Sequence, residues 1–196
     1  MIVPVWPLET ARLTLRPFEE NDLEALHEIH SDEVVARWLY NDARTREETR
    51  ALLAHKVTCP GLEREGDWLS AAAVVRETGE LVGDISLNWR SERHRQGELG
   101  FLVSPRHQGH GYATEAARAL LTFAFETLGL HRVVGTLEAR NIASARVLEK
   151  LGMRQEALLV ENEWLKGEWQ SELVYAILET EWRDGSAGSA RGDDRY

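Results

Sequence analysis

Hydrophobic and polar positions alternate in some stretches of the chain and recur every three or four residues in others. Alternation is typical of a half-buried strand, and the first example covers residues 12–16 and ends at Pro17. Spacing of three and four is typical of an amphipathic helix, and it predicts helices from Asn21 or Asp22 to about His30 and over residues 46–57. The first third of the chain is therefore expected to form one strand and two helices.

The rest of the chain predicts six more strands and two more helices. Residues 68–76 and 81–89 flank a turn-forming segment and predict a hairpin. Further strands are expected over 96–103, 131–138, 154–165 and 170–178, and helices over 111–128 and 143–151, each helix followed by a glycine that ends it. An antiparallel meander followed by a strand–helix–strand crossover predicts an α/β (α+β) fold with a mixed sheet and helices on both faces.

The length of the chain bounds its organisation. A chain of 196 residues is expected to form a single domain, here 1–183, which is large enough for its own hydrophobic core. Residues 184–196 are rich in Gly, Ser, Asp and Arg, a composition typical of disorder, so a disordered tail is predicted there.

Charge and composition exclude several classes of function. The formal net charge of −10 argues against nucleic-acid binding, which usually needs a basic surface. The single cysteine, Cys59, cannot form an intrachain disulfide, and no motif has the spacing of a metal site, so no metal is expected. No apolar run approaches membrane-spanning length, and the first residues lack the pattern of a signal peptide. We therefore expect no membrane partner and a cytoplasmic location.

A glycine-bearing turn follows strand 96–103 and leads directly into helix 111–128. Its central sequence is Arg106-His107-Gln108-Gly109-His110-Gly111-Tyr112-Ala113-Thr114. The first turn of a helix has backbone N–H groups without helical partners, and the helix dipole favours an anion there. Gly109 and Gly111 carry no Cβ that would keep a phosphate away from the backbone. The turn therefore predicts a cradle for a pyrophosphate.

Two common phosphate-binding motifs do not fit this turn. The phosphate loop of nucleotide triphosphatases requires Lys followed by Ser or Thr after its last glycine, whereas Tyr112-Ala113 follows Gly111. The dinucleotide fingerprint requires a third glycine, whose place Thr114 takes. That fingerprint also belongs to a doubly wound sheet, which an antiparallel meander does not form.

The turn does resemble a loop of another kind. Arg106-x-x-Gly109-x-Gly111 is similar to the Arg/Gln-x-x-Gly-x-Gly/Ala loop of the GNAT superfamily of N-acetyltransferases, which binds the pyrophosphate of acyl-coenzyme A (acyl-CoA). Residues 141–153 resemble the Asn-x-x-Ser-x-Arg/Lys-x-x-x-Lys-x-Gly-Phe segment of the RimJ/RimL-like branch, with Met153 in place of Phe. Residues 8–18 and the Gly167-Glu168-Trp169 turn resemble that branch too, so the resemblance covers about residues 8–180.

The resemblance implies a fold and a donor site. The fold would be a mixed, mostly antiparallel sheet of about seven strands, in which the parallel strands 96–103 and 131–138 splay apart around the acyl-CoA. Acetyl-CoA is the expected donor, with another short acyl-CoA as the alternative. The residues implied in binding it are Leu102, Val103, Arg106, Gln108, Gly109, His110, Gly111, Tyr112, Ala113, Thr114, Asn141, Ser144, Arg146 and Lys150.

The implied reaction is direct attack of an amine on the thioester. It needs a base that keeps the amine neutral and a proton donor for the departing thiolate. By resemblance, Ser144 occupies the position of the proton donor. Three glutamates are candidates for the base, in the order Glu163, Glu98 and Glu138. The tryptophans expected to border the acceptor pocket are Trp38, Trp164 and Trp169.

Together these features predict an N-acyltransferase that moves an acetyl group from acetyl-CoA to a primary amine. The acceptor is expected to be a protein N-terminus or a small molecule, and the acidic net charge favours a cationic one. The resemblance also implies a homodimer. The alternative is a non-catalytic acyl-CoA-binding or sensing domain, which would need the cradle but neither Ser144 nor a carboxylate near the thioester.

Overall fold

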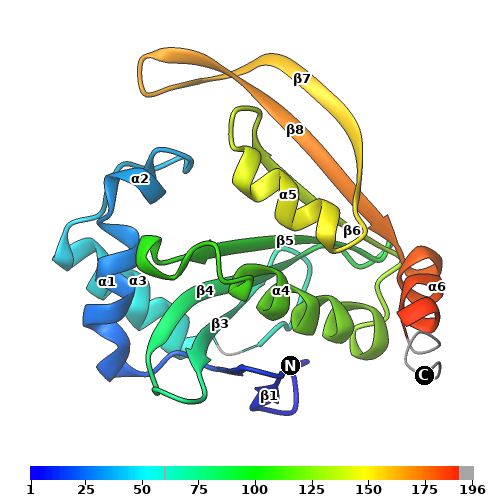
Figure 1. Ribbon diagram of the computed structural model, residues 1–196, viewed down its shortest axis with the longest axis horizontal. Coiled ribbons are helices and arrows are strands. Elements are labelled where there is room, and N and C mark those ends of the chain that lie inside the picture. The colour runs from blue at the N-terminus through cyan, green and yellow to red at the C-terminus, as the bar shows by residue number, and fades with distance from the viewer. Residues whose placement is uncertain (60, 190–196) are drawn as a thin grey trace, which may run out of the picture.

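One eight-stranded sheet runs through the molecule (Figure 1). The computed structural model describes residues 1–59 and 61–189. Its strands are β1 (Leu8–Glu9), β2 (Leu13–Arg16), β3 (Trp68–Val75), β4 (Leu81–Ser91), β5 (Gln96–Val103), β6 (Arg132–Glu138), β7 (Arg154–Leu165) and β8 (Glu168–Leu178). They lie in the order β1-β2-β3-β4-β5-β6-β8-β7, and all neighbours are antiparallel except β5 and β6.

The predicted fold class is therefore confirmed, with eight strands in place of about seven. The additional strand, β1, has two residues, which is too short for a pattern of alternating hydrophobicity. The other strands begin and end within a few residues of their predicted positions, because their alternation or continuous apolar character is visible in the sequence itself.

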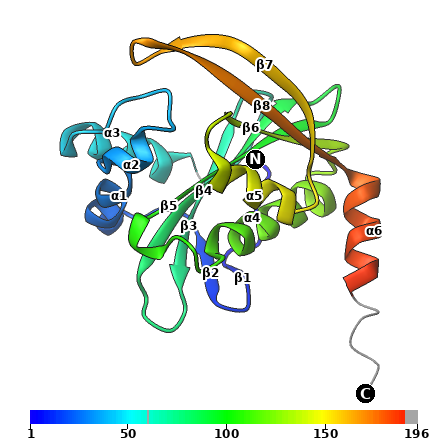
Figure 2. The same cartoon turned by 45° about the horizontal axis from the view of Figure 1, so that its top comes forward.

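Helices cover both faces of the sheet (Figures 1 and 2). They are α1 (Leu23–His30), α2 (Glu33–Ala36), α3 (Arg46–Thr58), α4 (Tyr112–Thr122), α5 (Ile142–Lys150) and α6 (Glu179–Ser189). Asp84 of β4 bonds to α1 and α3, whereas its neighbour Ile85 belongs to the core that includes residues of α4 and α5. Successive strand residues face opposite sides, so α1 and α3 lie on one face and α4 and α5 on the other. Within residues 1–59 and 61–189, no helix is long and apolar enough to cross a bilayer.

Two details of the helices differ from the prediction. The segment 111–128 forms α4 followed by a π-helical turn, Phe123–Thr127. The four-residue helix α2 is too short to show a helical period, and it depends on Asp32, whose side chain accepts hydrogen bonds from the N–H groups of Val34 and Val35.

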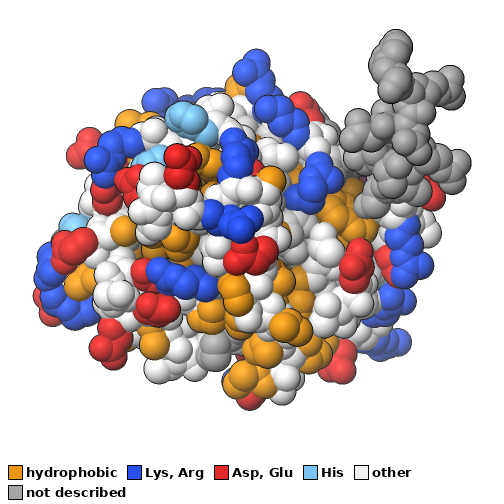
Figure 3. Space-filling model, turned by 60° about the horizontal axis from the view of Figure 1, so that its bottom comes forward, with side chains coloured by type: hydrophobic (Ala, Val, Ile, Leu, Met, Phe, Trp, Pro, Cys, Tyr) orange, Lys and Arg blue, Asp and Glu red, His pale blue; other side chains and the backbone are white. Residues whose placement is uncertain are grey.

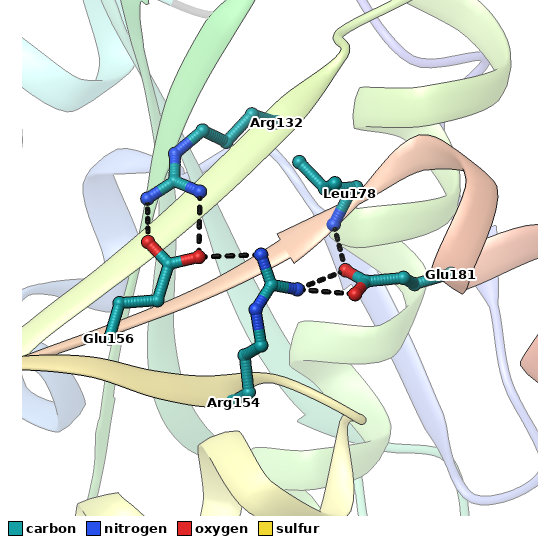
Figure 4. A network of polar contacts seen from close by, with 5 residues as sticks. All are labelled: Arg132, Arg154, Glu156, Leu178 and Glu181. Carbon is teal, nitrogen blue, oxygen red and sulfur yellow. Dashed lines mark hydrogen bonds and ion pairs between the residues drawn. The ribbon is translucent and has the colours of Figure 1, made fainter.

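Within the segment predicted to be a disordered tail, residues 184–189 form the second half of α6. Trp182 anchors that helix in the core, with its ring 5.8 Å from the ring of Phe125. Figure 4 shows a second anchor, in which Arg154 bridges Glu156 and Glu181. Both anchors involve residues before position 184, so the composition of the tail alone could not reveal them. Residues 190–196 lie outside the described residues.

β5 and β6 pair only at their N-terminal ends. The pairs are Gln96–Arg132, Gly97–Val133 and Glu98–Val134, yet β5 continues to Val103 and β6 to Glu138. Beyond Glu98 each strand keeps its other neighbour, β4 or β8, while the two diverge from one another. The predicted splay is thus confirmed, and it leaves backbone groups of both strands facing an open wedge.

β7 and β8 form a long hairpin that arches beyond the rest of the sheet (Figures 1 and 2). Its register shifts between Leu159 and Glu163, where Glu161 adopts a φ of 49°. In the hairpin turn, Lys166 donates a hydrogen bond from Nζ to the carbonyl oxygen of Ala36 in α2. The hairpin and the α2 segment therefore meet on the same side of the molecule.

Candidate active site

A cavity of about 590 Å³ lies in the splay between β5 and β6. One part of it is lined by the glycine turn (residues 104–114) and α5, including Gly109, Gly111, Ser144, Arg146 and Lys150. The other part, here called the acceptor chamber, is lined by the α2 segment and the β7–β8 hairpin, including Trp38, Tyr40, Glu163 and Glu172, and by Glu98 of β5. One space therefore connects the predicted phosphate cradle with a group of carboxylates.

The glycine turn has the geometry that a phosphate cradle needs. Gly109 and Gly111 have φ angles of 80° and 82°, which only glycine adopts readily. Gly111 is the N-cap of α4 and has no side chain to cap it, so the first N–H groups of the helix stay available to a ligand. A Cβ on Gly109 would meet no atom within 4 Å, so the turn opens onto free space. Gln108 fixes the turn to β5 by donating from Nε2 to the carbonyl oxygen of Val103, 3.1 Å away.

Most donor-site residues expected from the sequence line the cavity. They are Leu102, Val103, Gln108, Gly109, Gly111, Tyr112, Ala113, Thr114, Asn141, Ser144, Arg146 and Lys150. Two others point elsewhere. The Arg106 guanidinium forms an ion pair with Glu28 of α1, and the His110 ring stacks on Tyr112 with centroids 5.7 Å apart. Neither residue lines the cavity, and their contacts with the donor stay predictions.

Asn141 and Ser144 lie at the start of α5, beside the wedge. Asn141 is the N-cap, and its Oδ1 accepts a hydrogen bond from the backbone N–H of Ser144 at 3.1 Å. That bond places Ser144 in the first helical turn, where the helix dipole stabilises negative charge. Gly135 of β6 lets α5 approach the sheet, since a Cβ there would lie 2.9 Å from Cδ1 of Leu148. Ser144 thus lines the cavity from the first turn of α5.

The predicted glutamates differ in how far their carboxylates are already engaged. Glu138 has a side chain only 7% exposed, and its two oxygens accept hydrogen bonds from the backbone N–H and Nε of Arg140. Glu98 accepts a hydrogen bond from Oγ1 of Thr136 at 2.7 Å and has Arg90 at 3.7 Å. Both carboxylates line the cavity, but Glu138 is the more completely neutralised of the two.

Tyr40 and Glu172 are cavity residues that sequence reasoning missed. The Tyr40 hydroxyl donates to Oε2 of Glu172 at 3.2 Å and also lies against Glu163. Partial burial of this hydroxyl and the two carboxylates raise the pKa of Tyr40. Burial likewise raises the pKa of Glu172, to which the charges of Glu163 and Glu98 add, while the Tyr40 hydrogen bond and Arg90 oppose the shift.

A sequence signal existed for one of these two residues. Glu172 is a charged residue within the last predicted strand, 170–178. Because alternate side chains of a strand share one face of the sheet, the sequence places Glu172 on the same face as Val174. Tyr40 lies in an irregular segment between α2 and α3, where no periodic pattern indicates which side chain faces the sheet.

Of the three tryptophans expected at the acceptor pocket, only Trp38 lines the cavity, with the Arg37 guanidinium 5.0 Å from its ring centroid. Trp164 and Trp169 pack edge to face on the hairpin at 5.4 Å and are more than half exposed. Trp68, at the start of β3, lines the cavity instead.

Known proteins resemble this chain over most of its length. The family model described as "Acetyltransferase (GNAT) domain" matches residues 12–154. "Uncharacterized N-acetyltransferase YnaD" of Bacillus subtilis (strain 168) is 34% identical over 176 residues, which is 89% of this chain and 98% of that protein. Spermidine N(1)-acetyltransferase of Escherichia coli (strain K12) is 26% identical over 165 residues, covering 84% of this chain and 85% of that enzyme.

The fold of this chain is also similar to that of a solved acetyltransferase structure. The crystal structure of a GNAT-family acetyltransferase from Bacillus anthracis matches with a TM-score of 0.80 and 32% identity, covering 89% of this chain and 99% of that chain. The family match, the splayed strands and the glycine turn confirm the resemblance at the level of the superfamily. The chain belongs to the GNAT family and is an acyl-CoA-dependent N-acetyltransferase.

Proposed function

We propose that this enzyme transfers the acetyl group of acetyl-CoA to a cationic primary amine by direct attack. The observation that carries the proposal is the single cavity through the β5–β6 splay, with a phosphate cradle in one part and carboxylates in the other. A thioester lying in the splay would face the Ser144 hydroxyl and an amine held in the acceptor chamber, so both proton transfers of the reaction have a group in place.

The proposed donor site relies on backbone groups for most of its contacts. The backbone of Leu102 and Val103 is expected to pair with the pantetheine amides as an added strand would. Ser104 donates its backbone N–H to Val82 of β4, so the alternation of the ladder turns the backbone groups of Leu102 toward β4 and those of Val103 toward the wedge, where its N–H can pair with a pantetheine amide. The N–H groups of the glycine turn and of the start of α4 hold the pyrophosphate. Arg146 and Lys150 are exposed one turn apart on α5, where they supply cations for the phosphate groups.

In the chemical step, Ser144 donates its hydrogen bond to the departing thiolate and a carboxylate of the acceptor chamber takes the proton of the acceptor. Glu138 is bound to Arg140 at both oxygens and Glu98 is bound to Thr136. The Glu163 carboxylate lies against the Tyr40 hydroxyl. Of the three predicted candidates, it is therefore the one least engaged by neighbouring residues.

Two observations support an amine that carries positive charge at neutral pH. Glu98, Glu163 and Glu172 surround one space, which attracts a cation. The relative from E. coli acts, by its name, on spermidine, whereas the segment 141–153 resembles enzymes of the RimJ/RimL-like branch that act on protein N-termini. Both a small polyamine and a protein N-terminus therefore fit as acceptors. We also propose a cytoplasmic location, as expected from the sequence, and a homodimer, as the RimJ/RimL-like resemblance implies.

Thiol release from acetyl-CoA tests the proposed function. The intact protein is assayed with spermidine, a peptide with a free N-terminal serine, ethylamine and methoxyamine. We expect acceptor-dependent thiol release with at least one amine, and about 10²-fold slower turnover in Ser144→Ala with unchanged acetyl-CoA binding. Binding of acetyl-CoA without thiol release from any of these amines would favour the sensing domain, and absence of binding would contradict both functions.

A further inference from the structure

Glu172 lies closer to the splay than Glu163, the other hairpin glutamate that lines the cavity. β8 runs between β6 and β7, and Glu172 is the Cα partner of Glu138 on β6 and of Leu159 on β7. Glu163 lies on the edge strand β7, opposite Gln170 and near the hairpin turn. Glu172 is therefore one strand nearer to the C-terminal end of β6, where the wedge opens.

Charged and titratable groups from four other elements face Glu172. Tyr40 follows α2 and donates its hydrogen bond, Glu163 lies on β7, Glu98 on β5 and Arg90 on β4. Glu98 and Glu172 both line the acceptor chamber although β6 separates their strands. Glu138 is opposite Glu172 in the ladder, but its charge is matched by Arg140.

We propose that Glu172 is the carboxylate that removes the proton from the acceptor ammonium, with Tyr40 holding its Oε2 and Glu163 beside it. This inference rests on the proposed N-acetyltransferase function and assigns one step of it. The alternatives are less suited by geometry. Glu138 and Glu98 are engaged by Arg140 and Thr136, and Glu163 lies on the edge strand near the hairpin turn, farther from the splay. The raised pKa of Glu172 agrees with the assignment, since a base is most effective when its pKa lies near the working pH.

The reaction replaces the C–S bond of the thioester with a C–N bond and releases one proton. The acceptor R–NH₃⁺ gives one proton to the Glu172 carboxylate, and the lone pair of the neutral amine attacks the thioester carbonyl carbon. As the C–N bond forms, the C–S bond breaks and the sulfur leaves with its electron pair. The nitrogen then loses a second proton, which neutralises the thiolate by way of Ser144, and Glu172 releases the first proton to water.

A pair of acceptors with nearly the same shape tests this assignment. Ethylamine is protonated at pH 7 and needs a base, whereas methoxyamine is neutral at that pH and does not. We expect Glu172→Gln to lower kcat/KM for ethylamine by about 10²-fold or more and to change that for methoxyamine by less than about threefold. The matched control is Glu161→Gln, an exposed glutamate of the same hairpin, which should behave as the wild type with both amines. Acetyl-CoA binding and thermal unfolding of Glu172→Gln should match the wild type.

The pH profile of kcat/KM provides a second readout. Tyr40→Phe removes a hydrogen bond that stabilises the Glu172 carboxylate, so the pKa of Glu172 rises and the acid limb moves to higher pH. Glu163→Gln removes a like charge, so the acid limb moves to lower pH while at least a tenth of the activity remains.

Three outcomes would overturn the assignment. They are equal losses with both amines in Glu172→Gln, full activity of Glu172→Gln with ethylamine, and loss of turnover in Glu163→Gln. Failure of the underlying function looks different, because the wild type itself would then release no thiol with any of the four amines of the panel.

Discussion

Asp84 is a buried charged residue among those that line the cavity. Its carboxylate is 5% exposed and accepts hydrogen bonds from Nζ of Lys56 and Nε2 of His30, each at 3.0 Å. Lys56 also donates to Oγ of Ser70 at 2.9 Å. Burial would raise the pKa of Asp84, but Lys56 and His30 outweigh it and hold the pKa below its ordinary value. One ionised side chain thus joins α1 and α3 to β4.

Asp84→Asn should destabilise the protein strongly, because it leaves the Lys56 ammonium buried without its counter-charge. We expect the free energy of unfolding to fall by about 3 kcal/mol, measured by urea denaturation. The double variant Asp84→Asn with Lys56→Met removes the unpaired charge and should recover part of that loss. A decrease below about 1 kcal/mol for the single variant would contradict this account.

The stability difference between wild type and Asp84→Asn depends on pH. Because the pKa of Asp84 is lowered in the folded state, its ionised form favours folding at neutral pH. That contribution is present above the ordinary aspartate pKa of about 4 and is lost as the pH falls through the folded-state value. The difference in stability between wild type and Asp84→Asn should therefore narrow as the pH is lowered below about 4.

At the scale of elements, the glycine turn and the β7–β8 hairpin are positioned in different ways. The turn is local: a strand, two glycines at positive φ and a helix follow one another, and the sequence predicts all three. The hairpin depends on pairing. β7 has two more residues than β8 between the pairs Leu159–Glu172 and Glu163–Gln170. If the register of the Leu159–Glu172 pair continued without this shift, Glu163 would lie opposite Glu168, at the hairpin turn, and farther from Glu172.

This difference explains which site residues the sequence could reveal. Ser144 and the cradle follow from short motifs whose geometry is local, and both line the cavity. Tyr40 and Glu172 are brought together by contacts between segments 132 positions apart, and no local pattern encodes such a contact. Arg106 is a further example of a contact that no local pattern encodes. The motif predicts that its guanidinium contacts a phosphate, whereas in the structure it forms an ion pair with Glu28 of α1.

A single methyl group tests the role of the glycine turn. Gly109→Ala places a Cβ into the free space where the pyrophosphate is expected, so we predict at least a tenfold rise in the Kd of acetyl-CoA, measured by calorimetry. Gly79→Ala is a matched control, because that glycine also has a positive φ, 74°, and open space around its Cβ, but it lies in the β3–β4 hairpin. Both variants should lose about 1 kcal/mol of stability. Equal Kd values for the two variants would rule out the cradle.

At the scale of the whole molecule, the distribution of charge differs between the outer surface and the cavity. On the face shown in Figure 3, acidic and basic side chains are interspersed. The acceptor chamber, in contrast, brings the carboxylates of Glu98, Glu163 and Glu172 to one space, with Arg90 as the neighbouring cation. The proposed cationic acceptor would therefore be attracted both by the net charge of −10 and by this local acidic site.

Ionic strength should consequently affect acceptors according to their charge. Raising it from about 0.05 to 0.2 M screens the field of the protein, so kcat/KM for spermidine should fall several-fold. Methoxyamine carries no charge at pH 7, and its kcat/KM should stay constant under the same change, which makes it the control. A parallel decrease for both amines would mean that salt acts on the donor or on the fold.

The layout of the cavity also predicts the kinetic order of the proposed reaction. The glycine turn and α5 line one part of it, and the segment after α2 and the β7–β8 hairpin line another, so the proposed donor and acceptor sites lie in different parts of one space. The only cysteine, Cys59, lies at the end of α3 and does not line the cavity, so it is not placed to carry the acetyl group between them. Initial-rate plots at several fixed donor concentrations should therefore intersect, as for a ternary complex, instead of running parallel as in ping-pong exchange.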